Sequence, residues 1–159
     1  MMSPEAQRIQ QFLEGKGITV TVQELDTSTK TSQMAADALG CELAQIAKSV
    51  VFEGKDTGRP YIVVASGINR VDKDILSHVV GERARIASPE FVLANTGYTA
   101  GGVPPFAHDK EIEVFVDEDL TNYKVVWTAA GTSHGVFPIA PSDLIQAAKA
   151  KVLRIKSQI

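Results

Sequence analysis

One lysine lies inside a stretch whose other residues favour a β-strand, and its ammonium group could do chemistry. Residues 46–53 are IAKSVVFE. Alternation along a strand places Lys48, Val50 and Phe52 on one face and Ser49 and Val51 on the other. A lysine at the start of a strand is commonly solvated. The alternative is an ammonium that lines a pocket and holds a phosphate, or stabilises negative charge developing on an ester carbonyl.

Two long stretches, residues 91–107 and 125–142, contain no Asp, Glu, Lys or Arg. Both include glycine-rich, neutral segments that are too irregular for plain core strands. Their backbone N–H groups could bind a carbonyl, carboxylate or phosphate oxygen. Tight turns are the simpler interpretation, because Gly and Pro mostly serve chain reversal.

The second stretch contains the pattern GxSxG at residues 131–135, which is GTSHG. In α/β-hydrolases this pattern lies between a strand and a helix, with the acid and the histidine later in the chain. Here VFPIAP follows and predicts a strand, and no histidine comes after His134. A serine hydrolase triad is therefore excluded.

Metal and nucleotide sites have no support in the sequence. Cys41, His78, His108 and His134 are far apart and lack paired ligand spacing. A Walker loop and a GxGxxG motif are both missing. We expect no metal and no other cofactor.

Length and composition predict one globular domain over residues 1–159. The chain has 44% hydrophobic and 22% charged residues, close to the average for soluble domains. With 16 Lys plus Arg against 19 Asp plus Glu, its net charge of −3 excludes nucleic-acid binding through bulk positive charge. Two local basic groups remain: Lys149, Lys151, Arg154 and Lys156 in one, and Arg70, Lys73, Arg83 and Arg85 in the other.

The sequence also predicts a location in the cytoplasm and no contact with membranes. The longest apolar run, YIVVA at residues 61–65, is far shorter than the roughly 20 residues that a membrane-spanning helix needs. The first residues lack the pattern of a secretory signal. The single cysteine, Cys41, excludes a disulfide framework and fits a reducing compartment.

The pattern of hydrophobic and capping residues predicts helices and strands in mixed order. Helices are expected at residues 4–15, 32–39, 72–80, 89–95 and 141–151, with Thr31 or Ser32 and Ser88 as caps. Strands are expected at residues 18–25, 46–53, 61–66, 111–116, 124–129 and 135–139. Residues 54–60 fit a hairpin connection. The order lacks regular βαβ alternation, so we predict an α+β fold with a mixed sheet.

Four segments together resemble the YbaK and prolyl-tRNA synthetase-associated editing-domain family: TSQMAADALG, IAKSVVF, ASPEFVLANTGYTAGGVPPF and SHGVFPIAPSDLIQ. TGYTAGGVPPF, at residues 96–106, is the most specific of them, and Lys48 is the second anchor. The resemblance covers nearly the whole chain. It implies an α+β domain with a mixed, partly barrel-like sheet flanked by helices.

The resemblance also implies roles for individual residues. Lys48 matches the family's functional lysine, and the loop from Gly101 to Pro105 matches its GxxxP loop, whose backbone faces the aminoacyl carbonyl. We therefore expect catalytic roles for Lys48, Gly101 and Gly102. The expected substrate-binding residues are Ser49, Thr96, Gly97, Val103, Pro104, Pro105, Ser133 and His134. Ala107 departs from the family, in which glycine commonly follows PPF.

By resemblance, the protein is a free-standing enzyme that hydrolyses the ester of mischarged tRNA. The implied substrate is tRNA(Pro) carrying a small wrong amino acid such as alanine or cysteine, bound through its acceptor end. An aminoacyl-tRNA synthetase is a further candidate partner. The alternatives are a module that binds an aminoacyl-tRNA end or an adenosine-like ligand without turnover, and a structural domain whose glycine loops are only turns.

Overall fold

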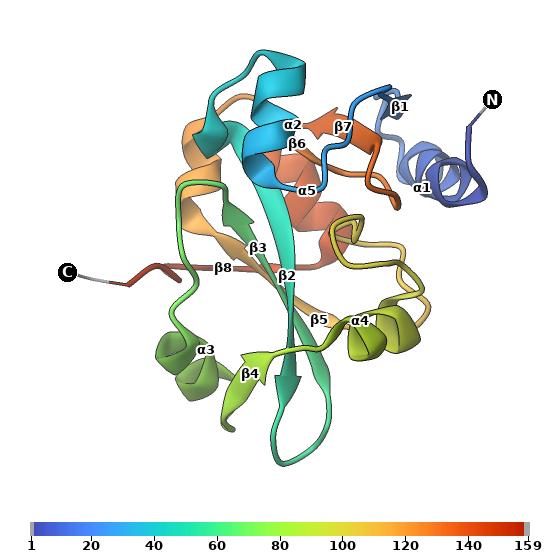
Figure 1. Cartoon of the computed structure of the whole chain (residues 1–159). Helices are drawn as coiled ribbons and strands as arrows, with labels where there is room; N and C mark the ends of the chain where they lie inside the picture. Colours follow the sequence, from blue (N-terminus) through green and yellow to red (C-terminus); the bar gives the residue numbers. More distant parts are fainter. Residues whose placement is uncertain (1, 158–159) are drawn as a thin grey trace.

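The computed structural model describes residues 2–157. A mixed sheet of eight strands forms its centre, in the order β1-β7-β6-β2-β3-β5-β8, with β4 paired to β2 (Figure 1). The strands are β1 Gln23–Glu24, β2 Ile46–Gly54, β3 Pro60–Ser66, β4 Ala84–Ile86, β5 Glu113–Asp117, β6 Val126–Ala129, β7 Gly135–Ile139 and β8 Lys151–Leu153. The α+β class and the mixed sheet are confirmed. The described path ends at β1 and β8 without joining them, so a barrel-like closure is not confirmed.

In the described part of the chain, five α-helices and two short 3₁₀ helices accompany the sheet. The α-helices are α1 Pro4–Gly15, α2 Ser32–Leu39, α3 Lys73–Val80, α4 Pro89–Thr96 and α5 Pro141–Ala148, and the 3₁₀ helices are η1 Leu43–Gln45 and η2 Glu118–Asn122. The predicted caps are confirmed, because the hydroxyls of Thr31 and Ser88 accept hydrogen bonds from Met34 N and Phe91 N. Gly40 and Gly97 end their helices in the left-handed conformation that glycine adopts at low cost.

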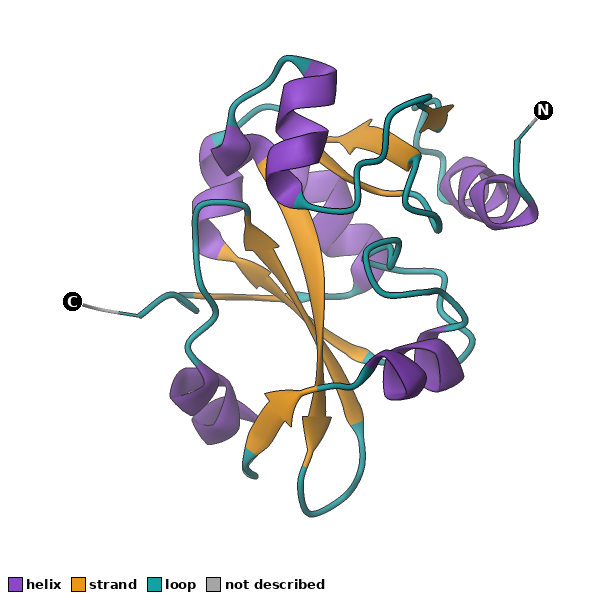
Figure 2. Cartoon of the chain, in the orientation of Figure 1, coloured by secondary structure: helices purple, strands orange, loops and turns teal. Residues whose placement is uncertain are grey.

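Figure 2 shows helices lying on different sides of the central strands. The two faces of the sheet carry separate hydrophobic clusters. The larger one packs α1, α4 and α5 against alternate residues of the central strands, among them Val51 and Ile62. The smaller one joins Phe52 and Phe115 to Leu76 of α3 on the other face. Because side chains alternate along β2, its successive residues belong to different clusters.

The predicted hairpin of β2 and β3 is confirmed, and its far end is tied down by one carboxylate. The two strands pair from Ala47 with Ser66 to Glu53 with Pro60. Glu82, which precedes β4, accepts hydrogen bonds from Asp56 N, Thr57 N, Thr57 Oγ1 and Tyr61 Oη at 2.6–3.0 Å. These four donors fix the turn against the β4 segment.

Three element predictions need correction. The strand expected at residues 18–25 is only β1, Gln23–Glu24. The last helix ends at Ala148 instead of 151, because Lys149 adopts a left-handed backbone with φ 52° and β8 follows. Strand β4 was not predicted, because its three residues include Arg85 and Ile86, both exposed at a sheet edge. Within residues 2–157, no helix combines the length and apolarity that crossing a membrane would require.

Candidate functional site

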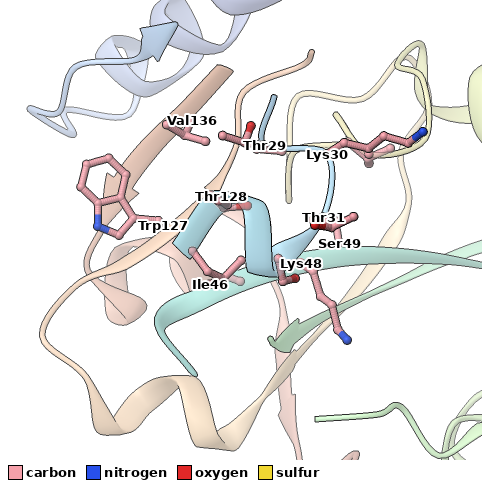
Figure 3. A pocket seen from close by; sticks show the side chains of 15 residues that line it. Thr29, Lys30, Thr31, Ile46, Lys48, Ser49, Trp127, Thr128 and Val136 are labelled. Carbon is pink, nitrogen blue, oxygen red and sulfur yellow. The ribbon is translucent and has the colours of Figure 1, made fainter. Parts of the chain in front are cut away.

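The ladder along one edge of β2 is interrupted. Strand β3 pairs along almost the whole of one edge of β2. The opposite, interrupted edge of β2 pairs with β6 only at residues 46–47 and with β4 only at residues 52–54. β2 and β6 diverge after Ala47 and Thr128, and a cavity of about 250 Å³ opens at this fork (Figure 3). The site therefore arises where two strands separate.

Segments far apart in the sequence line the cavity. They are residues 29–32 with Ala35 of α2, residues 46–49 of β2, Gly101 with Val103, residues 127–129 of β6, and Val136 of β7. Four predicted site residues meet here: Lys48, Ser49, Gly101 and Val103. A volume of about 250 Å³ lies just below the range of roughly 300–1,000 Å³ for pockets that hold drug-sized ligands. The cavity therefore suits a small group.

The charged residues that line the cavity, Lys30 and Lys48, are both cationic. The other polar lining residues are hydroxyl-bearing: Thr29, Thr31, Ser32, Ser49 and Thr128. Positive charge and neutral hydroxyls favour a ligand with negative charge or with an electron-rich carbonyl oxygen. The same lining gives no carboxylate partner to a cationic ligand.

Lys48 lies at the rim of the cavity and is half-buried. In Figure 3 its side chain extends away from Thr29, Thr128 and Val136. Burial lowers the pKa of the Lys48 ammonium, and the negative charge of Asp117 acts in the opposite direction. Lys48 is therefore not fully solvated, and its catalytic role stays a prediction.

The glycine loop presents its backbone to the same cavity. Gly101 has φ +91°, a conformation that side chains rarely adopt, and it packs beside Lys30. Within residues 2–157 the N–H of Gly101 makes no hydrogen bond, and the residue is exposed. Gly102 differs: it is buried, its carbonyl accepts from Gly131 N at 2.8 Å, and a Cβ there would lie 2.9 Å from the Thr132 backbone. Gly102 therefore holds the loop in place and does not line the cavity.

Two hydroxyls in this region have no hydrogen-bond partner among residues 2–157. Ser49 Oγ and Thr128 Oγ1 are both buried, and both residues line the cavity. A buried hydroxyl without a partner costs about 1–3 kcal/mol. A polar occupant or an ordered water would remove that cost.

The other predicted residues of the TGYTAGGVPPF segment lie outside the cavity. Thr96 is fully buried and donates to Val92 O at 2.7 Å, Gly97 ends α4, and the Pro104 carbonyl lies 2.7 Å from His108 Nε2. Pro105 lines a different groove, beside Phe12 and α5. These contacts shape the loop that carries Gly101.

Ala107, at the position where the family commonly has glycine, has φ 62°. This left-handed backbone explains the glycine, because a Cβ is unfavourable there.

Ser133 and His134 also lie outside the cavity lining. Ser133 O accepts from Thr29 N at 2.6 Å and from Thr29 Oγ1 at 3.1 Å, and His134 O accepts from Leu25 N at 2.9 Å. These bonds hold the segment that brings Thr29 and Lys30 to the cavity. The Ser133 hydroxyl lies 3.2 Å from Nδ1 of the neighbouring His134, which is exposed.

Sequence reasoning missed Lys30, Trp127 and Thr128 as cavity residues. Trp127 and Thr128 belong to the uncharged stretch 125–142, which was a usable signal. The sequence around Lys30 contains no such signal, because the contact between its segment and Gly101 depends on tertiary packing. Within residues 2–157 no three His, Cys, Asp or Glu side chains gather into a metal-binding group.

Comparison with known proteins identifies the family of the chain. Residues 26–147 match the family model of the aminoacyl-tRNA editing domain. The uncharacterized protein YwhH of Bacillus subtilis is 34% identical over 131 residues, covering 82% of this chain and 83% of YwhH. A protein of Enterococcus faecalis named "Putative Cys-tRNA(Pro)/Cys-tRNA(Cys) deacylase EbsC" is 24% identical over 129 residues, covering 80% and 78% of the two chains.

Two solved structures have the same fold as this chain over nearly its whole length. A crystal structure of "a putative trans-editing enzyme for prolyl tRNA synthetase" is 40% identical, with a TM-score of 0.92 over 99% of this chain and 100% of that one. The hypothetical protein APE2540 is 27% identical, with a TM-score of 0.88 over 94% and 99%. The family match spans the strands and loops that form the cavity, and the chain belongs to the aminoacyl-tRNA editing domain family.

Proposed function

We propose that the protein is a trans-editing aminoacyl-tRNA deacylase, with residues 1–159 forming one editing domain. The substrate is tRNA(Pro) that carries a small wrong amino acid, alanine or cysteine, bound by its acceptor end. The observation that carries the proposal is the small cavity at the β2–β6 fork, where Lys48 and the Gly101 backbone meet. Membership of the editing family and the similarity to EbsC, which is named a putative Cys-tRNA deacylase, support the same activity.

The chemistry requires little beyond orientation and charge stabilisation. A water oxygen attacks the aminoacyl carbonyl carbon, and the ester C–O bond breaks to release the amino acid and the ribose hydroxyl of the tRNA. The ester is already activated, and its neighbouring ribose hydroxyl and α-ammonium can assist the attack. The Gly101 N–H donates toward the developing oxyanion, and the Lys48 ammonium adds positive charge. Fixing the ester and the water in one geometry lowers the barrier further.

The size of the cavity supports a small side chain. Binding alone discriminates by about 1–3 kcal/mol per methylene, so a synthetase that accepts proline also admits smaller amino acids. A second, hydrolytic site that only small side chains can enter corrects this error. The cavity of about 250 Å³ has the dimensions of such a site.

A deacylation panel tests the proposal. The purified protein is incubated with tRNA(Pro) and with unrelated tRNAs, each charged with alanine, cysteine, serine or proline, and the remaining ester is measured over time. We expect faster loss of alanine or cysteine from tRNA(Pro), with proline retained. Buffer alone and the Lys48→Ala protein are the controls for spontaneous hydrolysis.

Binding is measured in parallel with non-hydrolysable amide analogues of the same aminoacyl ends. Tight binding without ester loss from any substrate would contradict the deacylase and favour a binding module. If the protein neither binds the analogues nor hydrolyses any ester, the cavity has no aminoacyl ligand. That result would reject both the deacylase and the binding module.

A further inference from the structure

A lysine, a small residue and an aspartate lie side by side on three neighbouring strands. Lys48 of β2 pairs with Ala65 of β3. The β3–β5 register runs to Val64 with Val116, which places Ala65 next to Asp117. Paired residues point to the same face, so Lys48 and Asp117 flank the short Ala65 side chain. Two strand spacings, about 10 Å, separate their backbones, and a lysine side chain spans much of that distance.

Asp117 is almost completely buried, at 1% exposure. Its carboxylate accepts hydrogen bonds from Ser66 N at 3.0 Å, Asn69 Nδ2 at 2.7 Å and Asp119 N at 3.0 Å. All three donors are neutral. Within residues 2–157 neither Asp117 nor Lys48 has an opposite charge within 4.0 Å. The carboxylate is therefore fixed in position, and its charge acts on the surroundings.

Three other charged residues near Asp117 act mainly on one another: Asp119, Arg154 and Lys156. Asp119, at the start of η2, pairs with Lys156 Nζ at 2.8 Å. Arg154 also acts on Asp119, and Lys156 lies within the field of Asp117. Ala65 contributes no charge from β3. Lys48 is thus the cation of the cavity rim that faces Asp117, and the field of Asp117 favours its charged form.

We propose that Asp117 is a positioning residue for Lys48: its buried carboxylate attracts the ammonium and directs it across Ala65 along the rim of the cavity. Without it, the ammonium would lose the opposite charge that holds it in this direction, and burial alone would act on the pKa of Lys48 and lower it further. The inference rests on the proposed function only where it predicts an effect of Asp117 on deacylation. The interaction between Lys48 and Asp117 is testable without any turnover.

Trace acetylation with acetic anhydride measures the interaction directly. The fraction of Lys48 that reacts is followed by mass spectrometry from neutral to alkaline pH, with the exposed Lys55 as internal reference. Asp117→Asn removes the charge and keeps a side chain that can cap η2. We expect the reaction midpoint of Lys48 to move to lower pH, since loss of a nearby opposite charge lowers the pKa of an ammonium. The pH at which kcat/KM for deacylation declines on the alkaline side should also move to a lower value.

Asp119→Asn is the matched control, because it removes the neighbouring carboxylate that Lys156 already offsets. It should leave the Lys48 midpoint unchanged. If Asp117→Asn fails to fold, Asp117→Ser replaces it, since serine is also a neutral cap. An unchanged midpoint in the folded variant overturns the proposal. A shifted midpoint in a protein that deacylates no substrate supports the interaction and rejects the proposed function separately.

Discussion

At the residue scale, the candidate site depends on one ammonium and one backbone amide. Lys48 could be predicted because a lysine interrupts an apolar strand and matches the family's functional lysine. Gly101 could be predicted from the glycine loop. Thr128 was missed although it lies in the uncharged stretch 125–142. Lys30 could not be predicted, because it reaches the cavity through a contact with Gly101 that exists only in the folded chain.

Lys48→Ala should reduce deacylation strongly and leave the fold intact. The substitution removes the rim charge but leaves Val50 and Phe52 packed on the same face. We expect kcat/KM to fall by about 10²-fold or more, the order found when a group that stabilises an oxyanion is removed. Turnover is measured together with the thermal unfolding midpoint. Normal turnover at normal stability would remove Lys48 from the mechanism.

Gly101→Ala and Gly102→Ala should separate activity from stability. A methyl group on Gly101 enters the cavity side of the loop, 3.2 Å from Lys30 Cγ, and strains a backbone with positive φ. We expect lower turnover per folded molecule and a modest loss of stability, about 1 kcal/mol. At Gly102 the methyl meets the Thr132 backbone at 2.9 Å, so the melting temperature should fall further. Equal effects of the two variants on both quantities would contradict this division.

At the element scale, residue patterns predicted the helices and the central hairpin better than the sheet edges. The caps at Thr31 and Ser88 act locally, so the sequence around them contains the whole signal. β8 was missed because QAAKAK continues a helical pattern, and only the backbone of Lys149 ends it. β1 and β4 are short strands that form only because they pair with other strands, β1 with β7 and β4 with β2.

Glu82→Gln should make the hairpin end less stable in a pH-dependent way. Hydrogen bonds, first of all from the Thr57 hydroxyl, lower the pKa of Glu82 from 4.5 to about 2. A lowered pKa means that the stabilisation is complete above pH 4.5 and is lost as the pH falls toward 2. The variant should therefore melt below the wild type at neutral pH, and the gap should narrow across that range.

Thermal melts at a series of pH values measure this difference. Glu111→Gln is the control, because Glu111 is exposed and takes part in no ion pair within residues 2–157. It should follow the wild type at every pH. A constant gap for Glu82→Gln from neutral pH down to pH 2 would reject the assigned pKa.

At the scale of the whole molecule, an acidic protein must bind tRNA through local charge. The C-terminal basic group includes Lys156, which pairs with Asp119, and Lys151, whose Nζ lies 4.0 Å from Glu113 Oε1. β8 is three strands away from β2, about 14 Å across the sheet. A tRNA bound at the cavity would therefore have to extend over the sheet edge to reach this group. A solvated chain end is the alternative.

Lys151→Ala combined with Arg154→Ala tests whether this group contacts acceptor-stem phosphates. Loss of two phosphate contacts should weaken binding of all tRNAs alike and reduce the slope of log affinity against log salt by about 1.4–1.8. Amino-acid preference should stay the same, because phosphate contacts do not read the esterified side chain. Lys55→Ala with Arg59→Ala, at the far hairpin end, is the control. Identical slopes in both double variants would assign the C-terminal group to solvent.

The position of Trp127 gives the molecule a built-in optical probe. It is the single tryptophan of the chain, and it lines the cavity beside Thr128. Indole emission responds to local polarity, so a small aminoacyl analogue that displaces water from the fork would change the spectrum without any added dye. The emission of the native protein therefore reports occupancy of the cavity separately from bond cleavage, in real time and on unmodified protein.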